Sequence, residues 1–245
     1  MHPRAIRAIC GAVVLGAIVA PNATAQNPGF GNAQPFHAIA LTAGAAALSV
    51  DPVNAVLTNS GFSSLPSRAM VGGAAAYFAF GRALLGANVQ RARVGERGSG
   101  NGRTDDLTAN AVAITGGYAV VSTNRLSVYP MVGVGLSRFA VTLHDNSGAP
   151  AATATQPTFA ELAQSPGAAS TLAGTHLVFD VGMGQDYLLK APAQEGASVT
   201  IGVRAGIVAA PNRTTWRSGA RTVVAGPDAS VGGPYLRVAV GVARR

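Results

Sequence analysis

Residues 198–208 read SVTIGVRAGIV, and every second residue from Val199 to Ile207 is apolar. The residues between them are Ser198, Thr200, Gly202, Arg204 and Gly206. Successive side chains of a β-strand point to opposite faces of the sheet, so a two-residue period is the signature of a strand. The stretch therefore predicts a strand with one apolar face and one face of small and polar residues.

The same alternation recurs along the chain, although its phase is ambiguous near Phe139 and within 68–78. We expect eight strands, at residues 37–49, 68–78, 81–94, 107–121, 125–143, 175–189, 197–209 and 233–244. Long polar connections at 51–67, 95–106, 144–174 and 210–232 alternate with short ones at 79–80, 122–124 and 191–196. Short turns at one end and long loops at the other are typical of bacterial outer-membrane barrels. The prediction is an all-β fold, an eight-stranded antiparallel up-and-down transmembrane β-barrel.

The surroundings of such a barrel decide which face of each strand points outward. In lipid the sheet must close on itself and present apolar side chains outward. Charged and small residues then fill an interior that is only wide enough for side chains. A soluble barrel would have the opposite facing, and a periplasmic lipocalin-like binder of small ligands remains an alternative. An aromatic girdle is expected near the short-turn ends, from Tyr77, Tyr118, Tyr129 and Tyr187.

The N-terminus has the pattern of a secretory signal peptide. Arg4 and Arg7 precede an apolar run at 8–20, and Ala23-Thr24-Ala25 offers a cleavage site before Gln26. We expect a cleaved signal peptide at 1–25, an N-terminal segment at 26–36 and the barrel at 37–245. The one cysteine, Cys10, lies in the apolar run, which excludes a disulfide framework and a cysteine-based zinc cluster.

Composition limits the class of protein further. Only 11% of the 245 residues are charged and 31 are glycine, whereas soluble domains have roughly 25% charged residues. These values argue against an ordinary cytosolic enzyme. The formal net charge of +8 indicates an anionic partner, and export favours lipopolysaccharide over nucleic acid.

Over residues 36–245 the chain resembles the small outer-membrane β-barrel proteins of Gram-negative bacteria, the architecture shared by OmpA-type transmembrane domains and OmpX-like proteins. The resemblance rests on pattern and implies a monomer in the bacterial outer membrane, inserted by the barrel-assembly machinery, with no cofactor. Such proteins usually end in an aromatic residue, whereas this chain ends Val242-Ala243-Arg244-Arg245. The resemblance implies a non-enzymatic structural or surface-interaction role, with specificity in the long extracellular loops.

Two sets of charged residues are candidate sites. Arginine forks suit phosphate groups, and the expected lipopolysaccharide contacts are Arg91, Arg93, Arg97, Arg103, Arg213 and Arg217. Inward-facing charges must be paired or hydrated, and the expected lumen network is Asp180, Asp186, Arg204 and Arg237. The narrow barrel favours a plug over a porin-like channel.

Catalysis is a second hypothesis. His144, Asp145 and His176 are expected near one external loop, where a histidine oriented by a carboxylate can act as a general base. A lipid A-modifying outer-membrane enzyme is therefore an alternative, although we expect no catalytic residues. The spacing of these residues is not that of a metal site. The loop at 147–174 is expected to be flexible apart from a short helix around Phe159–Gln164.

Overall fold

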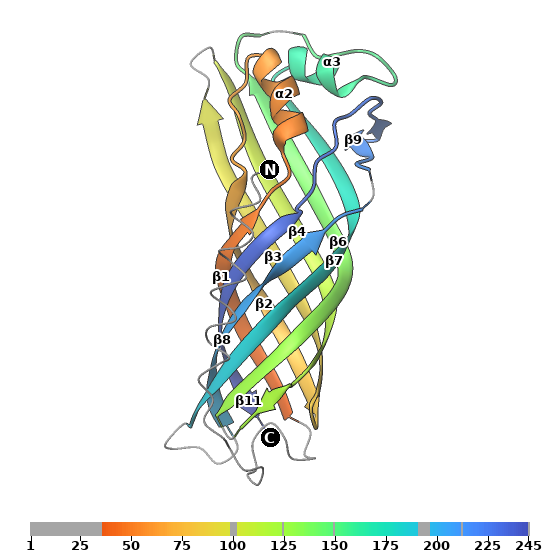
Figure 1. Ribbon diagram of the computed structural model, residues 1–245. Coiled ribbons are helices and arrows are strands. Elements are labelled where there is room, and N and C mark those ends of the chain that lie inside the picture. The colour runs from red at the N-terminus through yellow and green to blue at the C-terminus, as the bar shows by residue number, and fades with distance from the viewer. Residues whose placement is uncertain are drawn as a thin grey trace.

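The computed structural model describes residues 36–98, 102–123, 125–148, 150–190, 197–211 and 213–244. Eight long strands form a tall barrel (Figure 1). They are β1 (Phe36–Ala47), β2 (Arg68–Phe80), β3 (Ala83–Gly98), β4 (Arg103–Tyr118), β6 (Leu126–Asp145), β7 (Ala169–Lys190), β8 (Ala197–Ala209) and β11 (Gly233–Arg244). The expected signal peptide at 1–25, its Cys10 and residues 26–35 lie outside the described residues.

The barrel closes between its first and last long strands. Each long strand pairs antiparallel with the next, and β11 pairs with β1 from His37↔Arg244 to Ala46↔Tyr235. Closure leaves no unpaired sheet edge, which is the condition for a sheet to span lipid. The all-β, eight-stranded, antiparallel up-and-down order predicted from the sequence is confirmed.

Apolar side chains point outward over the middle of the barrel. Leu41, Ile114, Val132 and Val181 are between 61% and 72% exposed. The inward-facing Arg204 is 4% exposed. A soluble barrel buries its large aliphatic residues, so this facing is that of a membrane-spanning barrel and contradicts the lipocalin-like alternative.

The facing of the apolar residues reverses part-way along β6. Val132, Val134 and Leu136 are exposed on the outside, whereas Phe139, Val141 and Leu143 are 0% exposed on the inside. β4 changes at the same level. Val112, the register partner of Leu136, is 50% exposed, whereas Leu107, the partner of Val141, is 1% exposed. The reversal explains the ambiguous phase near Phe139, since the apolar residues of β6 lie on the outer face below this level and on the inner face above it.

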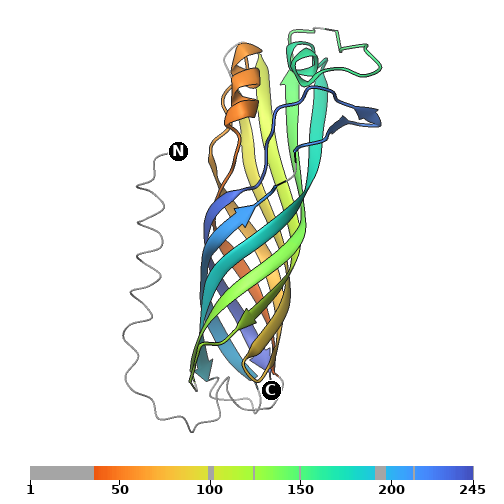
Figure 2. The same ribbon diagram turned by 45° about the vertical axis from the view of Figure 1, so that its right-hand side comes forward.

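Above this level the strands continue farther than expected (Figure 2). β3 runs to Gly98 and β4 starts at Arg103, so the expected loop at 95–106 is mostly strand. β7 starts at Ala169 and not near 175. The expectation was wrong because polar residues that indicated a loop lie within long strands, including the fully buried Asp105 of β4.

Two helices and three short strands occupy the connections. α2 (Asp51–Asn59) lies within the expected loop at 51–67, and α3 (Phe159–Gln164) matches the expected short helix. β9 (Trp216–Ser218) pairs with β10 (Arg221–Thr222), and β5 (Val121–Ser122) pairs with β6 near the opposite end. In the described part of the chain, neither helix is long and apolar enough to cross a membrane.

The expected girdle of four tyrosines is wrong for two of them. Tyr129 is 3% exposed inside the barrel, and the ring of Tyr77 lies 4.5 Å from the guanidinium carbon of Arg204. Both rings fill the lumen next to a charged side chain. A position near the end of a strand does not by itself show that a ring points inward. The exposed aromatic side chains near this end include Phe78, Phe80, Tyr118 and Tyr187.

Candidate functional site

The structure places all four expected lumen charges on the inward faces of β7, β8 and β11. Nη2 of Arg204 lies 3.2 Å from Oδ1 of Asp186. The Tyr129 hydroxyl donates to Oδ2 of Asp186 at 2.7 Å and accepts from Nε of Arg204 at 3.2 Å. The three side chains form a closed triangle in which each buried charge has an opposite charge or a hydrogen bond.

A second cluster lies on the loop side of this triangle. The Tyr235 hydroxyl donates to Oδ1 of Asp180 at 2.8 Å. The guanidinium carbon of Arg237 lies 4.0 Å from the Tyr235 ring centroid, a cation–π contact. Tyr235 thus connects Asp180 to Arg237. Tyr77, Tyr129 and Tyr235 were not predicted from the sequence as lumen residues. The alternation of their strands gives Tyr129 and Tyr235 an inward position.

Glycines make room for these side chains. A Cβ atom on Gly184 would collide with the ring of Tyr129, and one on Gly202 would collide with Oδ1 of Asp186. A cavity of about 40 Å³ remains on the loop side, lined by Asn88, Gln90, Ser137, Asp180 and Arg237 among others. It has room for only a few water molecules. The described interior is therefore filled by side chains.

At the far end from the C-terminus, the connections fold into a compact unit, the cap, made of residues 48–67, 150–168 and 213–232 (Figure 1). Trp216 is 1% exposed at its centre. Its ring meets Phe139 and Phe159 edge-on at centroid distances of 6.1 and 4.9 Å, and its Nε1 donates to the Pro227 carbonyl at 2.7 Å. The cap packs on the inward apolar faces of β4, β6 and β7 above the reversal.

Hydrogen bonds tie the three segments of the cap together. Ser49 and Ser230 form an antiparallel bridge, and Thr158 pairs with Val224. α3 begins with a capping box, in which Thr158 and Glu161 exchange side-chain to backbone hydrogen bonds of 2.7 and 3.1 Å. The expectation of a flexible loop at 147–174 is therefore replaced by an ordered, cross-linked segment at 150–168.

Arg103, at the start of β4, connects the cap to the barrel. Its guanidinium forms an ion pair with Asp145 at 2.9 Å. It also donates to the carbonyl of Ser60 after α2, and to the carbonyl of Gln164 in α3 at 3.1 Å. These bonds direct Arg103 into the cap, and the structure does not place it with the exposed arginines that are expected to contact lipopolysaccharide. Its spacing from Arg91 and Arg97 cannot show that it points inward.

Arg103→Gln is expected to open the cap without unfolding the barrel. The variant loses the ion pair and two carbonyl contacts, so proteolytic cleavage within 150–168 should become roughly tenfold faster. Limited proteolysis measures this, with Arg213→Gln as the control because Arg213 is exposed and is not one of the residues that contact Arg103 in these bonds. Equal cleavage rates in both variants would contradict the role of Arg103 in holding the cap.

Acid should weaken the same contact. Hydrogen bonds from Ser147 and from Arg103 lower the pKa of Asp145 below its ordinary value of 3.8. A lowered carboxyl pKa stabilises the folded form above the ordinary value, and this is lost as the pH falls through the lowered value. With an acid-active protease, the difference between the wild type and Asp145→Asn should begin to shrink as the pH falls below about 4 and should disappear below the lowered pKa of Asp145.

The other expected lipopolysaccharide contacts fall into two places. Arg91 and Arg93 are exposed on β3, and Arg93 pairs with Asp106 at 3.3 Å. Arg213 and Arg217 are exposed on the cap. For Arg97 the structure describes only the backbone, which pairs with Asp105 of β4.

The structure does not bring His144 and His176 together. His176 is 1% exposed in the lumen and pairs with Ser137. His144 lies seven residues beyond Ser137 on β6, where its register partner is Ala169. At about 3.4 Å per residue, His144 is about 24 Å along the strand from the level of His176. The expectation that they share one loop failed because β7 starts before His176. In the described residues, no three His, Cys, Asp or Glu side chains are placed to hold a metal.

Apolar side chains cover the outside of the closed barrel below the reversal, and Asp180, Asp186, Arg204 and Arg237 lie inside it. This is the architecture of a small outer-membrane β-barrel. A scan against protein-family models and a search of curated proteins give no match.

Solved structures similar to this barrel include Ail, the attachment invasion locus protein of Yersinia pestis, at 8% identity and a TM-score of 0.45, covering 86% of this chain and 98% of that one. Neisserial surface protein A is 12% identical with a TM-score of 0.40, covering 86% and 95%. The outer membrane protease OmpT from Escherichia coli is 10% identical with a TM-score of 0.34, covering 87% and 97%. At such identities, the likeness concerns the fold alone.

Proposed function

We propose that the protein is a non-enzymatic barrel of the bacterial outer membrane that does not conduct ions and presents the cap as an interaction surface outside the cell. The reversal of apolar facing along β6 carries this proposal. Leu136 is exposed below the reversal and Leu143 is fully buried above it. A strand has this pattern when its lower part faces lipid and its upper part faces water.

The orientation follows from the connections. Outer-membrane barrels have short periplasmic turns and longer extracellular loops. Here β2 and β3 are joined by the two residues Gly81 and Arg82, whereas the long connections at the other end form the cap. The cap then faces the outside, and the exposed Arg213 and Arg217 give it positive charge suited to an anionic partner such as lipopolysaccharide.

A plugged lumen supports a role other than conduction. Arg204, Asp186 and Tyr129 form one hydrogen-bonded group on three neighbouring strands, and Arg204 reaches across the interior to the ring of Tyr77 on β2. The cap packs over the loop end of the same interior. A non-enzymatic role is supported by the separation of His144 from His176. A closed sheet edge fits a monomer, inserted by the barrel-assembly machinery.

Membrane fractionation with gel electrophoresis tests the location. We expect the protein in the outer-membrane fraction, and we expect the unboiled sample to migrate differently from the boiled one because the closed barrel resists unfolding in detergent. A protein in the soluble periplasmic fraction with no shift on boiling would contradict the proposal.

Planar bilayer recording tests the plugged lumen. Purified protein should insert without resolved current steps, while a porin in the same bilayer serves as the positive control. Reproducible current steps from the wild type would contradict a plugged lumen but leave the membrane location standing.

A further inference from the structure

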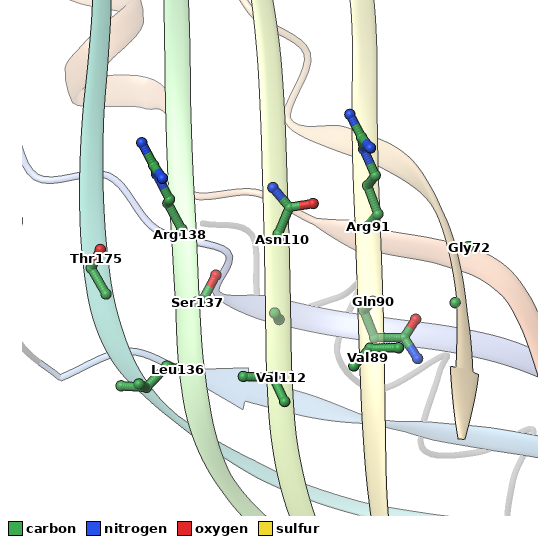
Figure 3. Close-up of a pocket in the computed structure, with 12 residues that line it drawn as sticks. Gly72, Val89, Gln90, Arg91, Asn110, Val112, Leu136, Ser137, Arg138 and Thr175 are labelled. Atoms are coloured by element: carbon green, nitrogen blue, oxygen red, sulfur yellow. The ribbon is translucent and has the colours of Figure 1, made fainter. Parts of the chain in front are cut away.

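A polar row crosses the outer surface at the level where the facing reverses. Arg91 of β3, Asn110 of β4, Arg138 of β6 and Thr175 of β7 are successive register partners. All four side chains are exposed. In Figure 3, Arg91, Asn110 and Arg138 lie side by side and extend away from the apolar residues below them.

The row directly adjoins the apolar band. The outward residues two positions toward the short-turn end are Val89, Val112 and Leu136, which are between 50% and 53% exposed. They pair across the strands at one level. If the barrel sits in the outer membrane as proposed above, the two arginines lie where the hydrocarbon of the outer leaflet ends and its headgroups begin.

A groove of about 450 Å³ runs along this surface. It is lined by both arginines, by Asn110 and by the aliphatic Val89, Val112 and Leu136, and it continues to Gly72 of β2, the register partner of Arg91. Gly72 has no side chain to fill the groove beside Arg91. The groove thus has cationic side chains at one end and apolar walls toward the membrane centre (Figure 3).

The positive charge in the groove is available to bind an anion. Arg93 forms an ion pair with Asp106, whereas neither Arg91 nor Arg138 pairs with a carboxylate in the described part of the chain. The two arginines stand two strands apart, about 10 Å between Cα atoms. One phosphate group can therefore accept hydrogen bonds from both guanidinium groups and from the Asn110 amide between them.

We propose that the groove binds the phosphate headgroup of an outer-leaflet lipid of the lipid A type. Arg91 and Arg138 hold the phosphate from both sides, and an acyl chain lies along Val112 and Leu136. This inference rests on the proposed membrane location and adds a ligand chemistry and a defined site. Arg138 had no place among the arginines expected from the sequence to contact lipopolysaccharide.

The test compares lipid binding by the full chain and its variants in detergent. The probe is bis-phosphorylated lipid A, with the same lipid after phosphatase treatment as its control. Arg91→Gln combined with Arg138→Gln should weaken binding of the phosphorylated form roughly tenfold. Arg82→Gln combined with Arg125→Gln removes the same charge from exposed positions near the opposite end and should leave binding unchanged.

Each outcome decides the proposal. A selective loss in the first variant supports it, provided that both variants keep the gel shift of a folded barrel. Equal losses in both variants would show non-specific attraction and overturn it, as would equal binding of the dephosphorylated lipid. Displacement by millimolar inorganic phosphate would show an ion site in place of a lipid site. A wild type that does not enter membranes would instead reject the proposed function itself.

Discussion

Arg204→Ala is expected to lower the free energy of unfolding by about 3–5 kcal/mol, because it leaves the Asp186 carboxylate in the lumen without its cation. Arg204 is 4% exposed, so water does not replace the lost partner easily. The variant also loses the hydrogen bonds to Tyr129 and the contact with the Tyr77 ring. Reversible urea unfolding in detergent measures the change.

The double variant Arg204→Ala/Asp186→Ala separates pairing from packing. If the cost arises from an unpaired charge, removing Asp186 as well should restore part of the lost stability. Additive losses in the double variant would show that the two side chains act independently and would contradict the ion pair as the reason for the effect.

Val134→Arg is expected to cost about 2–4 kcal/mol of folding free energy in bilayers, the cost measured for arginine on the lipid face of barrels near the membrane centre. Val134 is 47% exposed in the apolar band of β6. In water, such an exposed position would tolerate arginine with little change. Folding into lipid vesicles at increasing urea concentrations measures the difference.

Ala140→Arg is the matched control on the same strand. Ala140 also points outward, since its neighbours Phe139 and Val141 are fully buried inside. It lies beyond Arg138, where we place the outer face in water, so the substitution should change stability by no more than about 0.5 kcal/mol. Equal costs at both positions would show that the boundary is misplaced.

The strands near the C-terminus could be predicted closely from the sequence. β8 and β11 match the expected ranges 197–209 and 233–244, because each keeps a single alternation along its length. The inward facing of Arg204 and Asp180 follows from the same alternation. A two-residue period is enough where the apolar residues keep to one face of a strand throughout.

The cap and its contacts could not be predicted in this way. Above Leu136, the apolar residues of β6 lie on the inside. An alternation extended from the lower part of the strand therefore does not predict that Phe139 packs against Trp216. α2 was missed because its apolar residues Val53 and Leu57 bury against distant strands, which a local pattern does not show. Similarly, only the register reveals that Arg91 and Arg138 are close together while His144 and His176 are not.

The most direct test of the central claim is a nitroxide scan along β6 in lipid vesicles. Single cysteines at Val132, Val134, Leu136, Ala140 and Thr142 are labelled in a Cys10→Ser background, and collisions with oxygen and with a water-soluble nickel chelate are measured. We predict oxygen-dominated collisions up to Leu136 and chelate-dominated collisions from Ala140 onward. Chelate access at all five positions would contradict a membrane-spanning barrel whose outer face changes from lipid to water at Arg138.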